Sequence, residues 1–84
     1  MKILHIIRRC GDQLAQEITD YSRTAGDVSI LLIQDGVLSN LKGDDRIFAS
    51  VNDVEARGIS VRYELVDYPE ICQLIVEHDK VVVW

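Results

Sequence analysis

Ile30–Val37, with the sequence Ile-Leu-Leu-Ile-Gln-Asp-Gly-Val, is the stretch that decides the fold of this chain. Its apolar run stops abruptly at a polar bend, which Gly36 allows the backbone to make. An uninterrupted apolar run is typical of a strand buried on both faces, so helices are expected on each side of a mostly parallel sheet. Ligands bind such sheets outside the carboxyl ends of the strands, and this places Gln34, Asp35 and Gly36 where a partner or substrate is expected.

Apolar runs and helix signals alternate along the rest of the chain. Strands are predicted at Ile3–Ile7, Val28–Ile33, Arg46–Ser50, Val61–Val66 and Val81–Trp84. A short helical turn is predicted within Val37–Leu41, before the turn signal Gly43-Asp44-Asp45. This alternation predicts an α/β fold, a small and mostly parallel sheet with helices on both faces.

Capping signals delimit the predicted helices. A helix over Gln13–Thr24 is expected to begin after the N-cap Asp12 and to end at Gly26 in a left-handed conformation. Asn52 with Glu55 resembles a capping arrangement for a short helix that Gly58 terminates, and Asp67-Tyr68-Pro69-Glu70 starts the last helix. Its inner face is marked by Ile71, Leu74, Ile75 and His78, and His78 suits the negative helix end.

Size and charge exclude several classes of function. A chain of 84 residues predicts one domain, small enough that association with other subunits is expected. The net charge of −5 repels phosphate backbones, so direct nucleic-acid binding is not expected. No apolar stretch is long enough to cross a bilayer, and Arg8 and Arg9 interrupt any signal-peptide core. We therefore expect a cytoplasmic protein with no membrane partner.

Nothing in the sequence predicts a cofactor or a metal. The five glycines are too scattered for a dinucleotide or phosphate loop, and zinc-ligand spacing is absent. The two cysteines, Cys10 and Cys72, do not predict a disulfide framework in a reducing compartment.

Five short motifs resemble the DsrH/TusB family of sulfur-relay subunits, in the family's order and at near-family spacing. They are Ile3-Leu4-His5, Leu31-Leu32-Ile33-Gln34-Asp35-Gly36-Val37, Ala56-Arg57-Gly58, Val66-Asp67-Tyr68 and Val83-Trp84. The resemblance extends over nearly the whole chain. It implies a single DsrH/TusB-like domain over residues 1–84 with a DsrE/F/H-like fold.

The resemblance also implies partners and a pathway. It implies a complex in which three related small subunits assemble as a hexamer. The three are a DsrH/TusB-type subunit and its DsrE/DsrF-like (TusD/TusC-like) sister subunits. Such a complex accepts persulfide sulfur and passes it on. The TusBCD branch serves 2-thiolation of the tRNA wobble uridine, and the Dsr branch serves sulfur oxidation. Some members carry a cysteine midway along the first helix, whereas Leu14–Ser22 contains none and has Asp20 near that place. Because the family's best-supported sulfur acceptor lies on the sister E/D-type subunit, the resemblance implies a structural or regulatory subunit here.

Cys10 is the one candidate catalytic residue. It lies between a predicted strand and a predicted helix, and the cations Arg8 and Arg9 with the positive helix end favour the thiolate that attacks a sulfane sulfur. The other interpretation is a small, partly buried apolar side chain. His5 either assists Cys10 or is a hydrogen-bonded structural histidine. Cys72, beside the apolar face of the last helix, is expected in the core.

Gln34, Asp35, Gly36 and Trp84 are the candidate partner-binding residues. The first three either line a crevice or form a turn, in which Asp35 bonds nearby amides and Gly36 supplies the backbone angle. Trp84 either anchors an interface or packs against its own sheet. Arg57 either binds an anion or stabilises the carboxyl end of a helix.

Three functions follow from these observations. The first is an interaction subunit of a sulfurtransferase relay, itself non-catalytic, that serves tRNA thiolation. The second is a sulfurtransferase that carries persulfide on Cys10. The third is a homo-oligomeric binding protein with no role in sulfur transfer.

Overall fold

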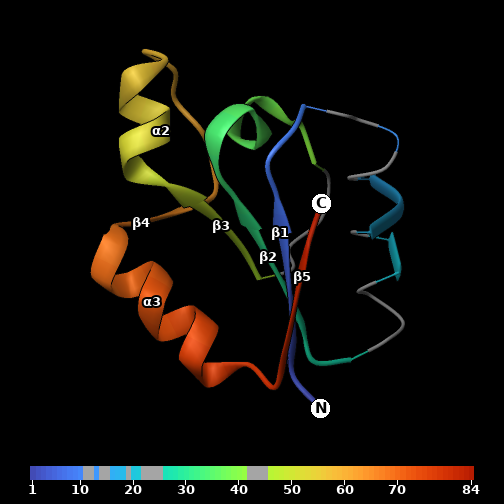
Figure 1. The fold of residues 1–84 in the computed structure, drawn as a ribbon. Helices are drawn as coiled ribbons and strands as arrows, with labels where there is room; N and C mark the ends of the chain where they lie inside the picture. The colour runs from blue at the N-terminus through green and yellow to red at the C-terminus, as the bar shows by residue number, and fades with distance from the viewer. Residues whose placement is uncertain (11–12, 14–15, 19, 22–25, 42–45) are drawn as a thin grey trace.

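The computed structural model describes residues 1–84 except residues 11–12, 14–15, 19, 22–25 and 42–45 (Figure 1). In chain order, its elements are β1 (Ile3–Ile7), β2 (Val28–Leu32), η1 (Gln34–Leu38), β3 (Ile47–Ser50), α2 (Val51–Ala56), β4 (Glu64–Val66), α3 (Tyr68–Glu77) and β5 (Lys80–Val83). Residues 13, 16–18, 20 and 21 are also helical, within the predicted range Gln13–Thr24. The rest of that helix, its N-cap Asp12 and the turn Gly43-Asp44-Asp45 lie outside the described residues.

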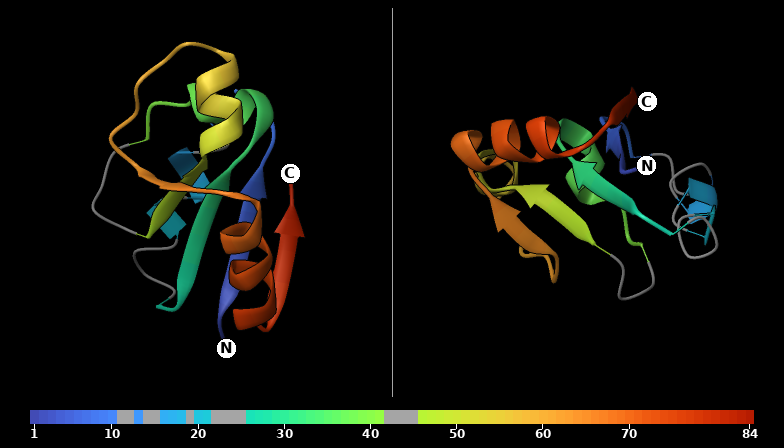
Figure 2. Two further views of the ribbon diagram at one scale, coloured as in Figure 1. Left: turned by 90° about the vertical axis from the view of Figure 1, so that its left-hand side faces the viewer. Right: turned by 90° about the horizontal axis from the view of Figure 1, so that it is seen from below.

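The strands form one five-stranded sheet in the order β4-β3-β2-β1-β5. Every neighbouring pair is parallel, which confirms the predicted α/β class. The chain steps from β1 outward to β4, and α3 then brings it back so that β5 adds to the other side of β1 (Figure 2). The strand β1 therefore lies where the winding of the sheet reverses, a position beside which ligands bind in open α/β sheets.

Helices and apolar side chains cover both faces of the sheet, because successive strand residues point to opposite sides. One core cluster consists of Ile7, Ile18, Ile30, Leu32, Val37, Leu41, Ile47, Ala49 and Val54. The other consists of Leu4, Ile6, Leu31, Val66 and Leu74. The helix α3 lies on one side of the sheet, and the described helical residues between 13 and 21 lie on the other (Figure 1).

The last helix begins as the sequence predicts. The Asp67 carboxylate accepts a hydrogen bond of 3.0 Å from the Glu70 amide, and the Glu70 carboxylate accepts one of 3.1 Å from the Asp67 amide. This reciprocal capping box satisfies two amides that the helix itself leaves without partners. Of the predicted inner face, Leu74 and His78 are buried, whereas Ile75 is 41% exposed.

Three predicted boundaries are wrong by more than one residue. The short helical turn predicted within Val37–Leu41 begins earlier, at Gln34, and ends at Leu38 as η1. The helix α2 starts directly after β3, with Ser50 at the N-cap and no side-chain capping bond, so the arrangement predicted for Asn52 and Glu55 does not form. The fourth strand is shorter than Val61–Val66, because Val61 and Tyr63 pack on the first core cluster ahead of β4. The end of α2 is as predicted, since Gly58 follows the C-cap Arg57 with a φ of +59°.

Candidate functional site

The carboxyl edge of the sheet gathers the residues that the sequence singled out. Cys10 follows β1, Gln34 and Asp35 follow β2, and Trp84 follows β5. Because β1 lies between β2 and β5 and all three strands are parallel, these segments leave the sheet at the same edge. The structure thus brings the predicted partner-binding residues and Cys10 to one end of the molecule.

The bend after β2 is built differently from the prediction. Gln34, not Gly36, has a positive φ, of 51°. Gly36 is buried, and a Cβ atom on it would overlap the carbonyl oxygen of Ile7. Glycine is required there because η1 packs directly on the backbone at the end of β1. The Gly36 amide donates a 2.8 Å hydrogen bond to the carbonyl of Ile33, which closes the turn.

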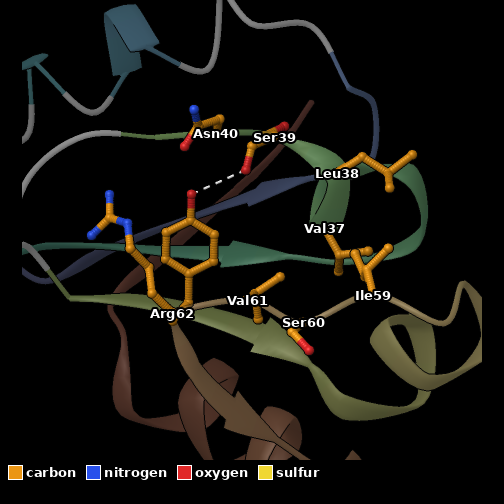
Figure 3. Close-up of a pocket in the computed structure, with 9 residues that line it drawn as sticks. Val37, Leu38, Ser39, Asn40, Ile59, Ser60, Val61 and Arg62 are labelled. Atoms are coloured by element: carbon orange, nitrogen blue, oxygen red, sulfur yellow. Dashed lines mark hydrogen bonds between the residues drawn. The ribbon is translucent and has the colours of Figure 1, made fainter.

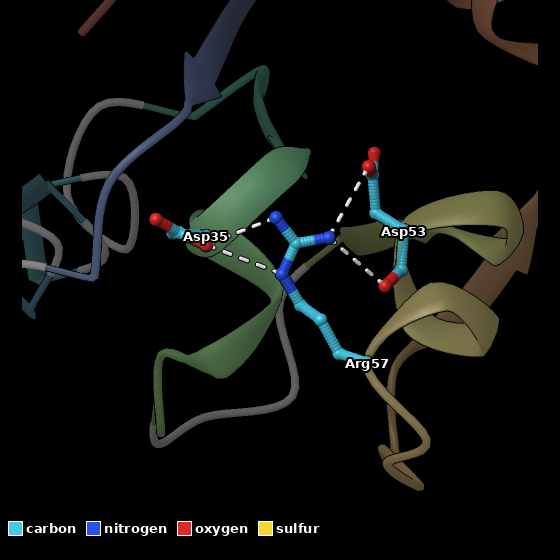
Figure 4. A network of polar contacts seen from close by, with 3 residues as sticks. All are labelled: Asp35, Asp53 and Arg57. Atoms are coloured by element: carbon cyan, nitrogen blue, oxygen red, sulfur yellow. Dashed lines mark hydrogen bonds and ion pairs between the residues drawn. The ribbon is translucent and has the colours of Figure 1, made fainter.

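Arg57 fixes the position of η1 relative to α2 (Figure 4). Its Nε and Nη2 donate to Asp35 Oδ1 at 3.2 and 2.9 Å, and its Nη1 donates to the Asp53 carbonyl at 3.2 Å. Nη1 also lies 3.5 Å from Asp53 Oδ1. Arg57 thus bonds the backbone of α2 near its carboxyl end, in line with the interpretation that it stabilises the helix. Asp35 binds the Arg57 guanidinium, whereas the sequence predicted that it would bond nearby amides.

An apolar groove of about 400 Å³ opens at this edge, between α3 and the ends of β1, β2 and β3. Apolar side chains from the strands and the helix line most of it, namely Ile6, Leu31, Ile33, Tyr68, Ile71 and Ile75. The polar and thiol groups of the lining are Gln34, Ser50, Asn52, Asp53 and Cys72. Such a groove suits an apolar side chain or segment, with polar groups at hand for orientation.

The prediction that Cys72 lies in the core is wrong. Its side chain is exposed and borders this groove. The helix contacts the sheet through Ile71 and Leu74, and residue 72 is turned about 100° around the helix axis from residue 71. Cys72 therefore lies on the flank of α3, and sequence periodicity alone marked it only as adjacent to the apolar face.

A second cavity, of about 380 Å³, lies between the end of η1 with the residues that follow it and the segment that leads into β4. Residues 37–40 face residues 59–62 across it (Figure 3). The Tyr63 hydroxyl ties the two segments together, since it donates to the Ser39 carbonyl at 3.0 Å and accepts from the Leu41 amide at 2.7 Å. Arg62 donates to the Leu41 carbonyl and stands 5.1 Å from the Tyr63 ring centroid. These hydrogen bonds link the loop after η1 to the loop before β4 and have a structural role.

The two histidines have structural partners. Nδ1 of His5 accepts a 3.0 Å hydrogen bond from the Trp84 indole, and burial together with the charge of Lys80 lowers the pKa of His5. His78 bonds the Leu74 carbonyl in the last turn of α3 and the Ser29 hydroxyl of β2. His78 thus lies at the negative helix end, as predicted.

Cys10 is exposed after β1, beside Arg8 and Arg9. The Arg8 Nε donates to the Trp84 carbonyl at 3.2 Å, so this cation also holds the segment after β5. The residues that follow Cys10 lie outside the described part, and the predicted helix end beside it is therefore not described. Cys10 and Cys72 are not joined in a disulfide.

The described residues contain neither a cluster of metal ligands nor a membrane-spanning helix. Among residues 1–10, 26–41, 46–84 and the described positions of 13–21, no group of three or more His, Cys, Asp or Glu side chains could hold a metal ion. Within the same residues, no helix has the length and apolar character needed to cross a bilayer.

The fold and this edge define a class, a small α/β protein with a parallel sheet and an apolar groove at the carboxyl ends of its strands. The family model for DsrH-like proteins matches residues 14–81. A Protein TusB from Pectobacterium parmentieri is 40% identical over 70 residues, covering 67% of this chain and 74% of the relative. A second Protein TusB, from Photorhabdus laumondii subsp. laumondii, is 32% identical over 69 residues, covering 66% of this chain and 73% of the relative.

The chain belongs to the DsrH family, and the resemblance seen in its motifs is confirmed. Family membership implies a sulfur-relay subunit involved in tRNA thiolation.

Proposed function

We propose that this chain is an interaction subunit of a cytoplasmic sulfur-relay complex, which docks to DsrE/DsrF-like sister subunits and leaves the principal sulfur-carrying thiol to one of them. The observation that carries the proposal is membership in the DsrH family over residues 14–81. The relay serves 2-thiolation of the tRNA wobble uridine, which agrees with the two TusB relatives. The candidate docking residues Gln34, Asp35 and Trp84 lie at the carboxyl edge of the sheet. Gly36, the fourth candidate, shapes the bend that carries Gln34 and Asp35.

The hydrogen bonding of His5 and the surroundings of Cys72 support a non-catalytic role. A persulfide carrier needs a stabilised thiolate, and a cationic histidine would supply one. The imidazole of His5 is held by Trp84 and its pKa is lowered, so it is neutral at pH 7. Cys72 is exposed and borders a mostly apolar groove whose lining contains no cationic side chain.

One observation favours direct sulfur transfer, because Cys10 is exposed beside Arg8 and Arg9. In that reaction the Cys10 thiolate attacks the outer sulfur of a donor persulfide and forms a new S–S bond. The donor's own S–S bond breaks, the donor leaves as a thiolate, and Cys10 carries the sulfur. The homo-oligomeric alternative predicts neither this adduct nor a sister complex.

Assembly is the first test. The chain is co-expressed with its E-type and F-type sister subunits under reducing conditions, and the mixture is analysed by size exclusion with light scattering. One defined complex that contains all three chains supports the proposal, and omitting each sister in turn shows which contact is direct. If the chain elutes apart from both sisters, the proposal is wrong.

Intact-mass analysis separates the two roles. The reduced chain is treated with glutathione persulfide, alongside Cys10→Ser and Cys72→Ser. A structural subunit retains no added sulfur that depends on Cys10. An added sulfur atom that persists in Cys72→Ser and disappears in Cys10→Ser supports direct transfer instead.

The pathway is tested in cells. Deletion of the gene is expected to remove 2-thiouridine from tRNA hydrolysates, and the Cys10→Ser variant is expected to restore it. Normal 2-thiouridine after deletion contradicts a role in tRNA thiolation.

A further inference from the structure

The hydroxyl of Ser50 is a buried polar group without a hydrogen-bond partner in the described part of the chain. Ser50 ends β3, and its side chain shares a face with Phe48, which packs on the core cluster that contains Leu74 of α3. Ser50 is only 5% exposed and lines the apolar groove at the carboxyl edge, so its remaining accessible surface opens into that groove. The hydroxyl forms no capping bond to α2 and no other hydrogen bond to a described residue. Because buried hydroxyls are normally hydrogen-bonded, Ser50 indicates that a polar group from outside the chain binds in the groove.

The rest of the groove has the composition of a small-molecule site. Its volume of about 400 Å³ lies within the range of about 300–1,000 Å³ of such sites, and most of its lining is apolar. It opens at the carboxyl ends of β1, β2 and β3, beside the strand where the winding of the sheet reverses. Gln34, which also lines the groove, has a φ of 51°, a backbone conformation that non-glycine residues rarely adopt and that recurs at ligand sites. The groove thus combines an apolar wall with a few polar groups, as ligand sites do.

The charges in the groove favour an uncharged ligand. The described lining contains no cationic side chain, so an anionic head group would lose its hydration without gaining an ion pair. The one carboxylate in that lining belongs to Asp53, whose Oδ1 already lies 3.5 Å from Nη1 of Arg57 (Figure 4). The other polar groups are hydroxyls, carboxamides and a thiol, from Ser50, Tyr68, Gln34, Asn52 and Cys72. Hydroxyls and carboxamides match a head group that both donates and accepts hydrogen bonds.

We propose that the groove binds a small uncharged organic molecule, with an aliphatic body against the isoleucines of the lining and a carboxamide-like head group on the Ser50 hydroxyl. The inference goes beyond the proposed function and does not depend on it. An ammonium head group fits less well, because it would lose its hydration to reach a carboxylate that Arg57 already pairs.

Cys72 provides a direct measure of binding, because its thiol is exposed at the groove. The full chain with Cys10→Ser is equilibrated with mixed disulfides of 2-mercaptoethanol and hexanethiol derivatives that differ only in a terminal carboxamide, carboxylate or ammonium group. The Cys72 thiolate attacks the sulfur that carries the hexyl chain, a new S–S bond forms, the S–S bond of the probe breaks, and 2-mercaptoethanol leaves as the thiolate. Excess 2-mercaptoethanol makes the exchange reversible, so the occupancy in intact-mass spectra measures the affinity of the groove for each probe.

The carboxamide probe is expected to occupy Cys72 with an equilibrium constant about tenfold above that of the carboxylate probe, because only the carboxylate must give up the hydration of a charge. The ammonium probe is also expected to bind less well than the carboxamide probe. The control is the Cys72→Ser variant, in which Cys10 reacts. Cys10 lies beside Arg8 and Arg9, so it is expected to favour the carboxylate probe instead.

The contact with the head group is tested with Ser50→Ala. No described residue bonds this hydroxyl, so alanine is expected to leave the midpoint of urea unfolding unchanged. The equilibrium constant of the carboxamide probe is expected to fall by about threefold to tenfold, and that of a plain hexyl probe is expected to stay the same. The matched control is Ser60→Ala, at an exposed serine outside the groove, which is expected to leave all probes unaffected.

Each outcome supports or overturns the proposal. Equal occupancy by the carboxamide, carboxylate and ammonium probes, or the same order at Cys72 as at Cys10, would show that the groove does not select a ligand. Stronger binding of the ammonium probe would show that Asp53 selects a cation, and would overturn the uncharged class. If Ser50→Ala keeps the full preference for the carboxamide probe, the proposed head-group contact is wrong. None of these results bears on assembly with sister subunits, which the co-expression experiment tests separately.

Discussion

The indole nitrogen of Trp84 donates a 3.0 Å hydrogen bond to Nδ1 of His5, which joins the residue after β5 to the middle of β1. The ring centroids are 6.0 Å apart, with 32° between the planes. Because an indole N–H only donates, Nδ1 must accept, and the ring proton of neutral His5 lies on Nε2. Nε2 is buried and has no hydrogen-bond partner among the described residues.

A double-mutant cycle measures this contact. Trp84→Phe removes the donor and leaves a buried nitrogen without a partner, so the free energy of unfolding is expected to fall by about 1–3 kcal/mol. Combined with His5→Leu, the cycle is expected to give a coupling energy of about 0.5–1.5 kcal/mol in urea unfolding. Additive effects of the two substitutions would show that the bond contributes nothing.

The buried imidazole predicts a dependence of stability on pH. Burial, and then the charge of Lys80, lower the pKa of folded His5 below its ordinary value of 6.5. The unfolded state therefore binds more protons than the folded state as the pH falls through 6.5, and stability declines toward acid. Above that pH, the contribution is fully present.

Urea unfolding between about pH 7.5 and pH 5.5 measures this effect. The free energy of unfolding of wild type, relative to that of His5→Leu, is expected to decline toward acid, because the leucine variant lacks this titration. The titratable groups that both proteins share cancel in the difference. Lys80→Gln keeps the histidine, removes the smaller cause and is expected to weaken the trend. Parallel pH profiles for wild type and His5→Leu would contradict the prediction.

Local patterns in the sequence were sufficient to predict most elements of the fold. The apolar runs of β1 and β2 predict buried strands, because strands covered on both faces need little else. The capping box at Asp67 marks the start of α3, since that signal depends on neighbours in the chain. The order of the strands could not be derived this way, because the pairing of β5 with β1 joins residues far apart in sequence.

The candidate site was predicted in position but not in detail. Gln34 and Asp35 lie at the expected edge, yet the partner of Asp35 is Arg57, 22 residues further along the chain. The exposure of Cys72 depends on the angle at which α3 meets the sheet, which the spacing of apolar residues does not fix. The need for glycine at residue 36 comes from the backbone of β1 and is invisible to turn rules.

Glycine is needed at residues 36 and 58 for different reasons, steric crowding at Gly36 and a positive φ at Gly58, and substitutions at the two positions distinguish these reasons. At Gly36, an added Cβ meets the Ile7 carbonyl, so alanine is expected to cost about 1–3 kcal/mol of stability or more, and the larger asparagine is expected to cost more than alanine. At Gly58, φ is +59° and the space is open, so alanine costs about 1–2 kcal/mol and asparagine costs less. Urea unfolding of the four variants measures this inverted ranking. The same order of asparagine and alanine at both positions would contradict it.

Alkylation of the native chain tests the positions of the two thiols. Cys10 and Cys72 are both exposed, so iodoacetamide is expected to add two groups without denaturant, and Cys10→Ser and Cys72→Ser are each expected to take one. Intact-mass analysis over time gives the rate at each thiol. If Cys72 reacts only in urea, its thiol lies in the core, and the placement of Cys72 on the exposed flank of α3 is wrong.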